Sequence, residues 1–295
     1  LNRSLLIGFV SVLLLGVAMA CSTKKNTFMS RNFHALTTKY NVLFNGEVAL
    51  QKGVEELRIT YRDNFWEMLP IERLDISDEM VMPGVKKNPN FERAETKAVK
   101  AVQKHSMLIA REERNKQIDD AYLLLGKSRY YSKRFVPALE AFNYVIINYP
   151  KANLINETII WQAKTQVRLQ NEEQAIRSLS NLLNDKSLKS DIKEHAHTVI
   201  AMAYLNLDSL QLVIDHLNKA VVSDNNKEQT ARNLFILGQL YSEKGLKDSS
   251  NIAFQKVIDL KKAPYKYKIH AQLEKAKNST NKLDAEETLA ILKKL

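Results

Sequence analysis

The side chains most often used as nucleophiles and metal ligands are scarce in this chain. Its 295 residues contain one cysteine and six histidines. The H-E-x-x-H spacing of zinc proteases is absent, and His195 and His197 are two residues apart, so on a helix they point to different sides. Phosphate-binding loops and hydrolase nucleophile elbows are also absent. We therefore predict no catalytic residue, no metal site and no cofactor, and we expect the protein not to be an enzyme.

The single cysteine, Cys21, stands at the end of the only long apolar run, Leu5 to Ala20. That run is shorter than a typical membrane-spanning helix and suits a signal-peptide core. Small residues followed by cysteine are the pattern of a bacterial lipoprotein signal, in which the thiol receives lipid. We predict a lipoprotein signal peptide over residues 1–20 and lipidation of Cys21. The alternative is an uncleaved anchor with an incidental cysteine.

The residues after Cys21 bear on location. Ser22 is compatible with transfer to the outer membrane, and the stretch STKKN is basic rather than acidic. We therefore expect a lipid-anchored protein of the outer membrane that faces the periplasm.

The rest of the chain repeats itself with the spacing of tetratricopeptide units. Small residues of the expected first helices, Gly126, Ala163, Ala201 and Gly238, recur at intervals of 37, 38 and 37 residues. A second marker follows each by 12 residues, and a large residue such as Phe142 or Phe254 comes four later. The small residue lets two helices approach closely, and we expect the large one to fill the space against the next unit. The pattern predicts an all-α fold, a tetratricopeptide-repeat superhelix (α-solenoid), with four repeats over 119–262.

The region before the repeats is less regular. We predict an N-terminal helical region over 21–118, with helices at 34–61 and 90–117 that are interrupted by a long loop at 62–90. Loops of this length are usually functional or disordered. The apolar side chains of Phe65, Trp66 and the Met80–Met82 stretch favour docking onto the array or onto a partner.

The net charge of +11 is concentrated near the C-terminus. The stretch KKAPYKYKIHAQLEKAKN, residues 261–278, contains six lysines and one glutamate. We predict a basic C-terminal helical segment over 263–295 that either binds an acidic protein or envelope polymer or is simply a solvated helix face. We expect no nucleic acid, because a periplasmic protein meets none.

Partners of tetratricopeptide arrays bind on the concave surface, which the first helix of each pair lines. Helical spacing places mixed cationic and apolar side chains there, which suits an acidic segment with apolar anchors. The apolar members of this set could equally pack between repeats. The predicted partner-binding residues are Lys127, Tyr130, Lys164, Met202, Leu205, Phe235 and Gln239.

Three stretches together resemble the SprE/PorW lipoproteins of Bacteroidetes. They are CSTKKNTFMSRNFHALTTKYNVLFNG from Cys21, FERAETKAVKAVQKHSM, and DDAYLLLGKSRYY. The resemblance implies an outer-membrane scaffold that contacts other subunits of the type IX secretion machinery and serves gliding motility. Two alternatives stay open: a generic tetratricopeptide adaptor in outer-membrane protein assembly, and a peptidoglycan-associated envelope enzyme. The family is longer, and this chain starts with Leu and ends without a polar capping unit, so we interpret it as a piece of a longer repeat protein.

Overall fold

The computed structural model describes residues 22–74 and 88–278, with positions 286, 289–290 and 293 beyond them. The predicted signal peptide, Cys21 and the Met80–Met82 stretch lie outside the described residues. The chain divides into two compact units. Unit 1 comprises the chain to Thr60 and Leu74–Thr165, and unit 2 comprises Tyr61–Arg73 and the chain from Gln166. The 61–73 segment thus belongs to unit 2, although both stretches that flank it belong to unit 1.

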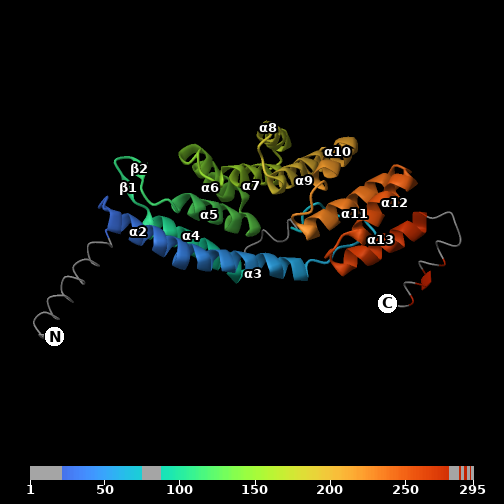
Figure 1. Ribbon diagram of the computed structural model, residues 1–295, viewed down its shortest axis with the longest axis horizontal. Helices are drawn as coiled ribbons and strands as arrows, with labels where there is room; N and C mark the ends of the chain where they lie inside the picture. Colours follow the sequence, from blue (N-terminus) through green and yellow to red (C-terminus); the bar gives the residue numbers. More distant parts are fainter. Residues whose placement is uncertain (1–21, 75–87, 279–285, 287–288, 291–292, 294–295) are drawn as a thin grey trace, which may run out of the picture. The chain divides into compact units, whose positions relative to one another are not determined.

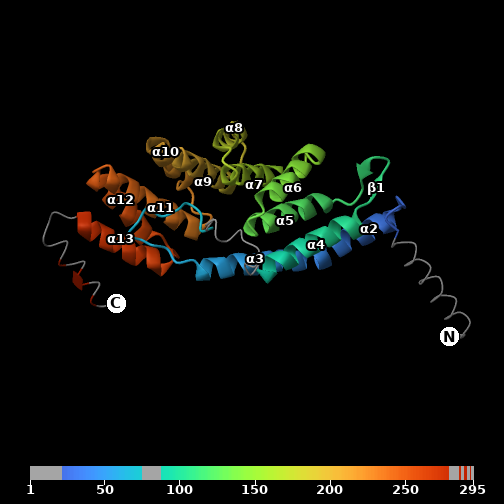
Figure 2. The same ribbon diagram turned by 180° about the vertical axis from the view of Figure 1, so that it is seen from behind.

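The described elements are almost all helical (Figures 1 and 2). Unit 1 begins with α2, a π-helical stretch η1, and α3, which follow one another without a break. A two-stranded antiparallel hairpin separates α4 from the repeat helices. The bounds are α2 Phe28–Thr37, η1 Thr38–Leu43, α3 Phe44–Thr60, α4 Pro89–His105, β1 Leu108–Ile109, β2 Glu112–Glu113, α5 Ile118–Tyr131, α6 Phe135–Asn148, α7 Ile155–Arg168, α8 Glu172–Leu183, α9 Ser190–Asn206, α10 Leu210–Ala220, α11 Lys227–Glu243, α12 Lys247–Asp259 and α13 Tyr265–Asn278.

The all-α class and the tetratricopeptide-like helix pairs predicted from the sequence are confirmed. In unit 1, α5 packs on α6; in unit 2, α9 packs on α10 and α11 packs on α12. The first helix of every pair ends in the same way. A residue with positive φ follows it, and the next N–H bonds to the carbonyl five residues back, which is a Schellman-type end. These positions, Lys133, Gln170, Asp208 and Gly245, repeat at 37, 38 and 37 residues.

Glycine and phenylalanine form the close contact inside the best-formed repeats. A Cβ on Gly126 would lie 2.3 Å from the Phe142 ring, and one on Gly238 would lie 2.5 Å from the Phe254 ring. The expectation that these phenylalanines fill space only against the next unit was therefore incomplete. Each ring covers the glycine of its own pair, and Phe142 also stacks on Trp161 of α7.

The N-terminal region contains a further pair of the same kind. Helices α3 and α4 pack together, and a Cβ on Gly53 would meet the Phe91 ring at 2.4 Å. The predicted pair interrupted by a loop is thus present. The helical run starts earlier than predicted, at Phe28, where the Thr27 side chain accepts a hydrogen bond from the Ser30 N–H.

The prediction of a helix through residue 117, with Ile109 on its packed face, was wrong. Helix α4 ends at His105 and a short hairpin follows. Ala110 and Arg111 have φ of 51° and 65°, as a two-residue type I′ turn requires. The Glu113 carboxylate accepts hydrogen bonds of 2.8 Å from the N–H groups of Met107 and Asn115. Those bonds satisfy backbone donors outside the helix, which offsets the loss of helical hydrogen bonds.

Candidate protein-interaction grooves

The 61–73 segment lies in unit 2 as a non-helical peptide with a turn at residues 65–67, and side chains of α11 hold it through its backbone (Figure 1). The Gln239 amide donates to the Glu67 carbonyl at 2.7 Å and accepts from the Leu69 N–H at 3.1 Å. Arg232 Nε donates to the Pro70 carbonyl at 2.7 Å. Such bonds recognise an extended main chain whatever its side chains.

An ion pair at Asp63 adds side-chain selectivity. Its carboxylate, 1% exposed, accepts hydrogen bonds from Arg232 Nη1 at 2.7 Å and from Lys266 Nζ at 2.9 Å. Tyr267 Oη accepts from the same Arg232 nitrogen at 2.9 Å and from Arg73 at 3.0 Å. Burial by itself would raise the pKa of Asp63, but the charges and hydrogen bonds of Arg232 and Lys266 outweigh it and hold that pKa below its ordinary value. Unit 2 therefore selects a carboxylate at this point.

An aromatic pocket holds the side chain two residues further on. The Phe65 ring stacks on His270 at 3.9 Å between centroids, with 4° between the ring planes. It also packs edge-on against Phe235 at 5.2 Å and Tyr267 at 5.5 Å. Trp66 lies edge-on to the same His270 ring, at 6.1 Å between centroids, and is 64% exposed. The predicted docking of this loop onto the array is confirmed for its described part, and the recognition pattern is an acid, one spacer and an aromatic ring.

Unit 2 brings together only part of the predicted site. Phe235 and Gln239 contact the 61–73 segment, so the chain itself covers them. Met202 is buried and Leu205 is half-buried. Sequence reasoning missed the chief contact residues, Arg232, Lys266, Tyr267 and His270. The heptad-like spacing of Arg232, Phe235 and Gln239 on one helix face could have indicated the first of them.

Unit 1 brings together three predicted residues around one tryptophan. Lys127 Nζ lies 2.6 Å from a carboxylate oxygen of Glu157 and 5.6 Å from the centre of the Trp161 ring. Lys164 Nζ lies 4.8 Å from the same ring centre and 5.2 Å from that of Tyr130. Tyr130 is fully buried and packs edge-on against Trp161, so it supports the site from below. The tryptophan at the centre was absent from the predicted set.

Next to these residues runs a groove of about 740 Å³. Exposed Tyr40 and Phe44 line it, together with Lys127 and Glu157. Its wall thus mixes apolar rings with both signs of charge, whereas the predicted partner-binding face had only cationic and apolar side chains. We call it the unit-1 groove. Further lining comes from Lys39, Leu43, Glu47, Lys116, Gln117, Asp119, Asp120, Leu123, Leu124, Asn153 and Leu154.

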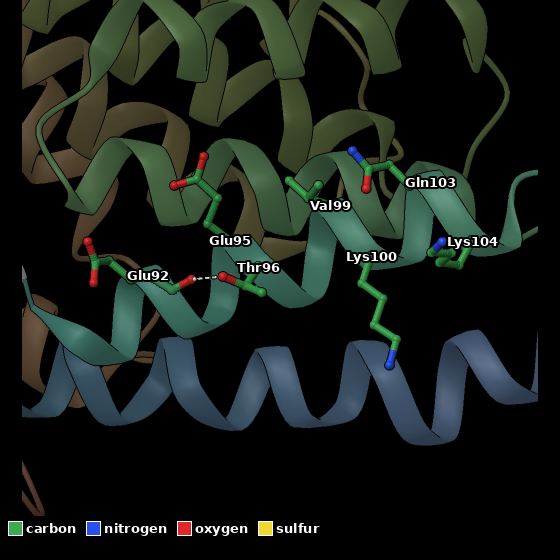
Figure 3. Close-up of a pocket in the computed structure, with 7 residues that line it drawn as sticks. All are labelled: Glu92, Glu95, Thr96, Val99, Lys100, Gln103 and Lys104. Carbon is green, nitrogen blue, oxygen red and sulfur yellow. Dashed lines mark hydrogen bonds between the residues drawn. The ribbon is translucent and has the colours of Figure 1, made fainter.

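A hollow of about 600 Å³ along α4 is a weaker candidate (Figure 3). All seven residues drawn there come from that one helix. The Thr96 hydroxyl donates to the Glu92 carbonyl at 2.8 Å, and Glu95 pairs with Arg129 and Arg134. Thr96 and Glu95 are thus already paired, and one helix supplies the whole lining, so no groups converge on the hollow from opposite sides.

The histidines form two pairs in the described residues. Nδ1 of His34 lies 3.1 Å from Nδ1 of His105, and the same atoms of His197 and His216 are also 3.1 Å apart. Burial, and then the charge of His216, lowers the pKa of His197 to about 4. In the part of the chain that the structure describes, no group of three or more candidate ligands could hold a metal. The described helices include none with the length and apolarity needed to cross a membrane.

Comparison with protein families agrees with the geometry of the first repeat. A family model described as tetratricopeptide repeat matches residues 120–152. Among solved structures, "Crystal structure of MamA" is 24% identical with a TM-score of 0.43, over 58% of this chain and 91% of that one. No curated protein matches. No enzymatic family is indicated. The chain therefore contains tetratricopeptide repeats, whose usual role is to act as scaffolds for protein–protein interaction.

Proposed function

We propose that this protein is a lipid-anchored scaffold of the outer membrane, facing the periplasm, that joins subunits of the type IX secretion and gliding machinery. The observation that carries the scaffold role is the 61–73 segment bound along α11 and α13. This contact within one molecule supports the proposal, because helices of unit 2 hold a non-helical peptide by its backbone, an acid and a ring.

The unit-1 groove is the proposed site for a partner subunit. Lys127 lines the groove and the exposed rings of Tyr40 and Phe44 lie along it. Lys127 also joins the groove to Trp161, the ring that Lys164 contacts from beyond the groove lining. An extended segment with carboxylates and an apolar anchor would match it. Binding would break the Lys127–Glu157 ion pair, so that Lys127 could pair with a carboxylate of the partner.

The secretion role rests on the resemblance of the N-terminal block to SprE/PorW lipoproteins. That block begins at Cys21 and continues through α2, η1 and the start of α3. The location in the outer membrane rests on Cys21 and Ser22 as a lipoprotein signal.

Deletion of the gene tests this function, with the wild-type gene returned as the control. We expect loss of cargo secretion and of gliding, a normal cell wall, and restoration of both activities by the returned gene. Wall defects with intact secretion would favour a peptidoglycan enzyme instead. Misassembled barrel proteins with intact gliding would favour a general adaptor in outer-membrane assembly.

A further inference from the structure

Helix α2 carries a set of large apolar side chains that the described chain leaves uncovered. Phe28 is 74% exposed, Met29 61%, Leu36 56% and Phe33 36%. Met29, Phe33 and Leu36 are spaced by four and three residues, so they lie on one face of the helix. The opposite face is packed, since Ser30 and His34 are buried. We call the four exposed residues the α2 face.

The stretch of sequence that contains α2 carries charge of one sign only. Residues 22–46 contain four Lys or Arg and no Asp or Glu. Lys24 and Lys25 precede the helix, Arg31 lies within it and Lys39 follows it. A short helix with aromatic and aliphatic residues on one side and only basic charge around it is typical of helices that lie in the surface of an anionic membrane.

The path of the chain brings this helix close to the expected lipid. The Ser30 hydroxyl donates a hydrogen bond to the carbonyl of Ser22, so the first described residue is held at the first turn of α2. Ser22 directly follows Cys21 in the sequence. Consecutive Cα atoms are about 3.8 Å apart, so acyl chains on Cys21 would put the membrane surface at this end of α2.

We propose that α2 is a second membrane contact, in which the α2 face lies in the headgroup region of a bilayer that contains anionic phospholipid. With ten residues, α2 is too short to span a bilayer, so it lies parallel to the surface. The inference deepens the proposed membrane location. It rests on the proposed function in one respect, namely the lipid anchor at Cys21. A basic amphipathic helix adds to the membrane affinity that acyl chains supply.

Vesicle binding by the unacylated protein tests the proposal. The chain from Ser22 onward, which contains every helix that the structure describes, is mixed with vesicles of phosphatidylethanolamine and phosphatidylglycerol, or of phosphatidylcholine alone. We expect sedimentation with the anionic vesicles, weakened by salt. Phe28→Ser with Phe33→Ser should lower the partition coefficient at least tenfold, and Lys24→Glu with Lys25→Glu should lower it on anionic vesicles only.

Val136→Ser with Ile147→Ser is the matched control, because these α6 side chains are 58% and 74% exposed. That variant should partition like the wild type. Equal partitioning of the α2 variant and this control, or no vesicle binding by the wild type, would overturn the proposal. So would an α2 variant that keeps vesicle binding but loses an envelope protein, since the face would then serve a protein partner. Because no acylation or secretion is involved, failure here is separate from failure of the proposed function.

Discussion

Asp63 and Arg232 are 169 positions apart in the sequence and form an ion pair of 2.7 Å in which each side chain is 1% exposed. The pair fixes a loop residue to the face of α11 and so makes the 61–73 segment part of unit 2. A buried pair of this kind costs desolvation, and its contribution is best seen when one partner is removed.

Removal of one member of the pair should destabilise unit 2 strongly. We expect Asp63→Ala to lower the free energy of unfolding by about 3–5 kcal/mol, because the buried Arg232 charge loses its carboxylate partner. Arg232→Ala should cost less, because Lys266 still pairs with Asp63. The double variant should lose clearly less than the sum of the two. Urea unfolding gives all three values. Glu67→Ala is the control, since its exposed side chain should matter by less than about 0.5 kcal/mol; additive losses would contradict the coupling.

The same pair should make stability sensitive to acid. The pKa of Asp63 lies below its unfolded value of 3.8, so the folded protein holds this carboxylate ionised more firmly than the unfolded chain does. The stabilisation is fully present above that unfolded pKa and is lost as the pH falls through the lower folded pKa. Asp63→Asn should flatten the fall in unfolding free energy below about pH 4. If the unfolding free energy of Asp63→Asn falls in acid as steeply as that of the wild type, other carboxylates cause the fall.

The lowered pKa of His197 should make the stability depend on pH in a higher range than Asp63 does. Its pKa in the folded protein is about 4, against 6.5 as the ordinary value, so the unfolded chain takes up the proton first. Stability should therefore fall as the pH drops from 6.5 to about 4, and this contribution should level off below. Unfolding free energies measured across that window should show a smaller slope for His197→Gln. If the unfolding free energy of this variant changes with pH as steeply as that of the wild type, the His197–His216 pair is not the cause of the pH dependence.

The close approach of Gly238 to Phe254 predicts a rescue. Gly238→Ala would place a methyl group 2.5 Å from the ring, and the overpacking should cost about 1–3 kcal/mol. Phe254→Leu should recover much of that cost in the double variant, because it removes the clashing ring. Gly245→Ala serves as a contrast in thermal unfolding. A methyl group on Gly245 would meet open space, but the residue has φ of +72°, which is strained for alanine. Phe254→Leu should therefore leave the stability cost of Gly245→Ala unchanged.

The repeat fold could be predicted because close helix packing requires small and large residues at regular spacing within each short repeat. Gly126 and Gly238 each contact a phenylalanine only 16 positions further along the chain. The turns after the first helices were harder, since only Gly245 of the four positive-φ positions is a glycine. The hairpin at 108–113 was missed because its stability comes from the Glu113 carboxylate, a contact that helical periodicity does not report.

The candidate site could be predicted only in part, for a related reason. Helical spacing placed Gln239 and Phe235 on the binding face of α11. It could not indicate that Asp63 and Phe65 of the same chain would occupy that face, because no local pattern links residues so far apart. Arg232 was missed because a charge on a helix is usually solvated, whereas here the 61–73 segment buries it.

Lipidation of Cys21 stays a prediction with a direct test. We expect the precursor, made in a related bacterium with labelled fatty acid, to carry label and to sediment with membranes. Cys21→Ala should lose the label, because no other thiol is available in the chain. The fatty-acid label is divided by the amount of protein, so that weaker expression of the variant does not lower the measured value. Equal label in both proteins would exclude the lipoprotein interpretation.

Charge reversal at Lys127, which lines the unit-1 groove, and at Lys164, which contacts Trp161 beside it, tests where a partner binds. Lys127→Glu with Lys164→Glu would surround Trp161 with carboxylates, next to Glu157. An acidic partner segment should then be repelled, and we expect association to weaken by at least about tenfold, which corresponds to about 1.4 kcal/mol. Added salt should narrow the difference between variant and wild type, because it screens exposed charges.

The readout is co-purification of secretion-system components from the native envelope at low and high salt. Lys186→Glu with Lys189→Glu reverses two exposed charges outside the groove and should leave co-purification unchanged. Helix content by circular dichroism must be equal in all three proteins, so that lost binding is not lost folding. If the groove variant retains its partners at both salt concentrations, the unit-1 groove is not their site. The exposed rim of the 61–73 segment around Trp66, where Lys277 lies 4.4 Å from the ring centre, would then be the surface to change next.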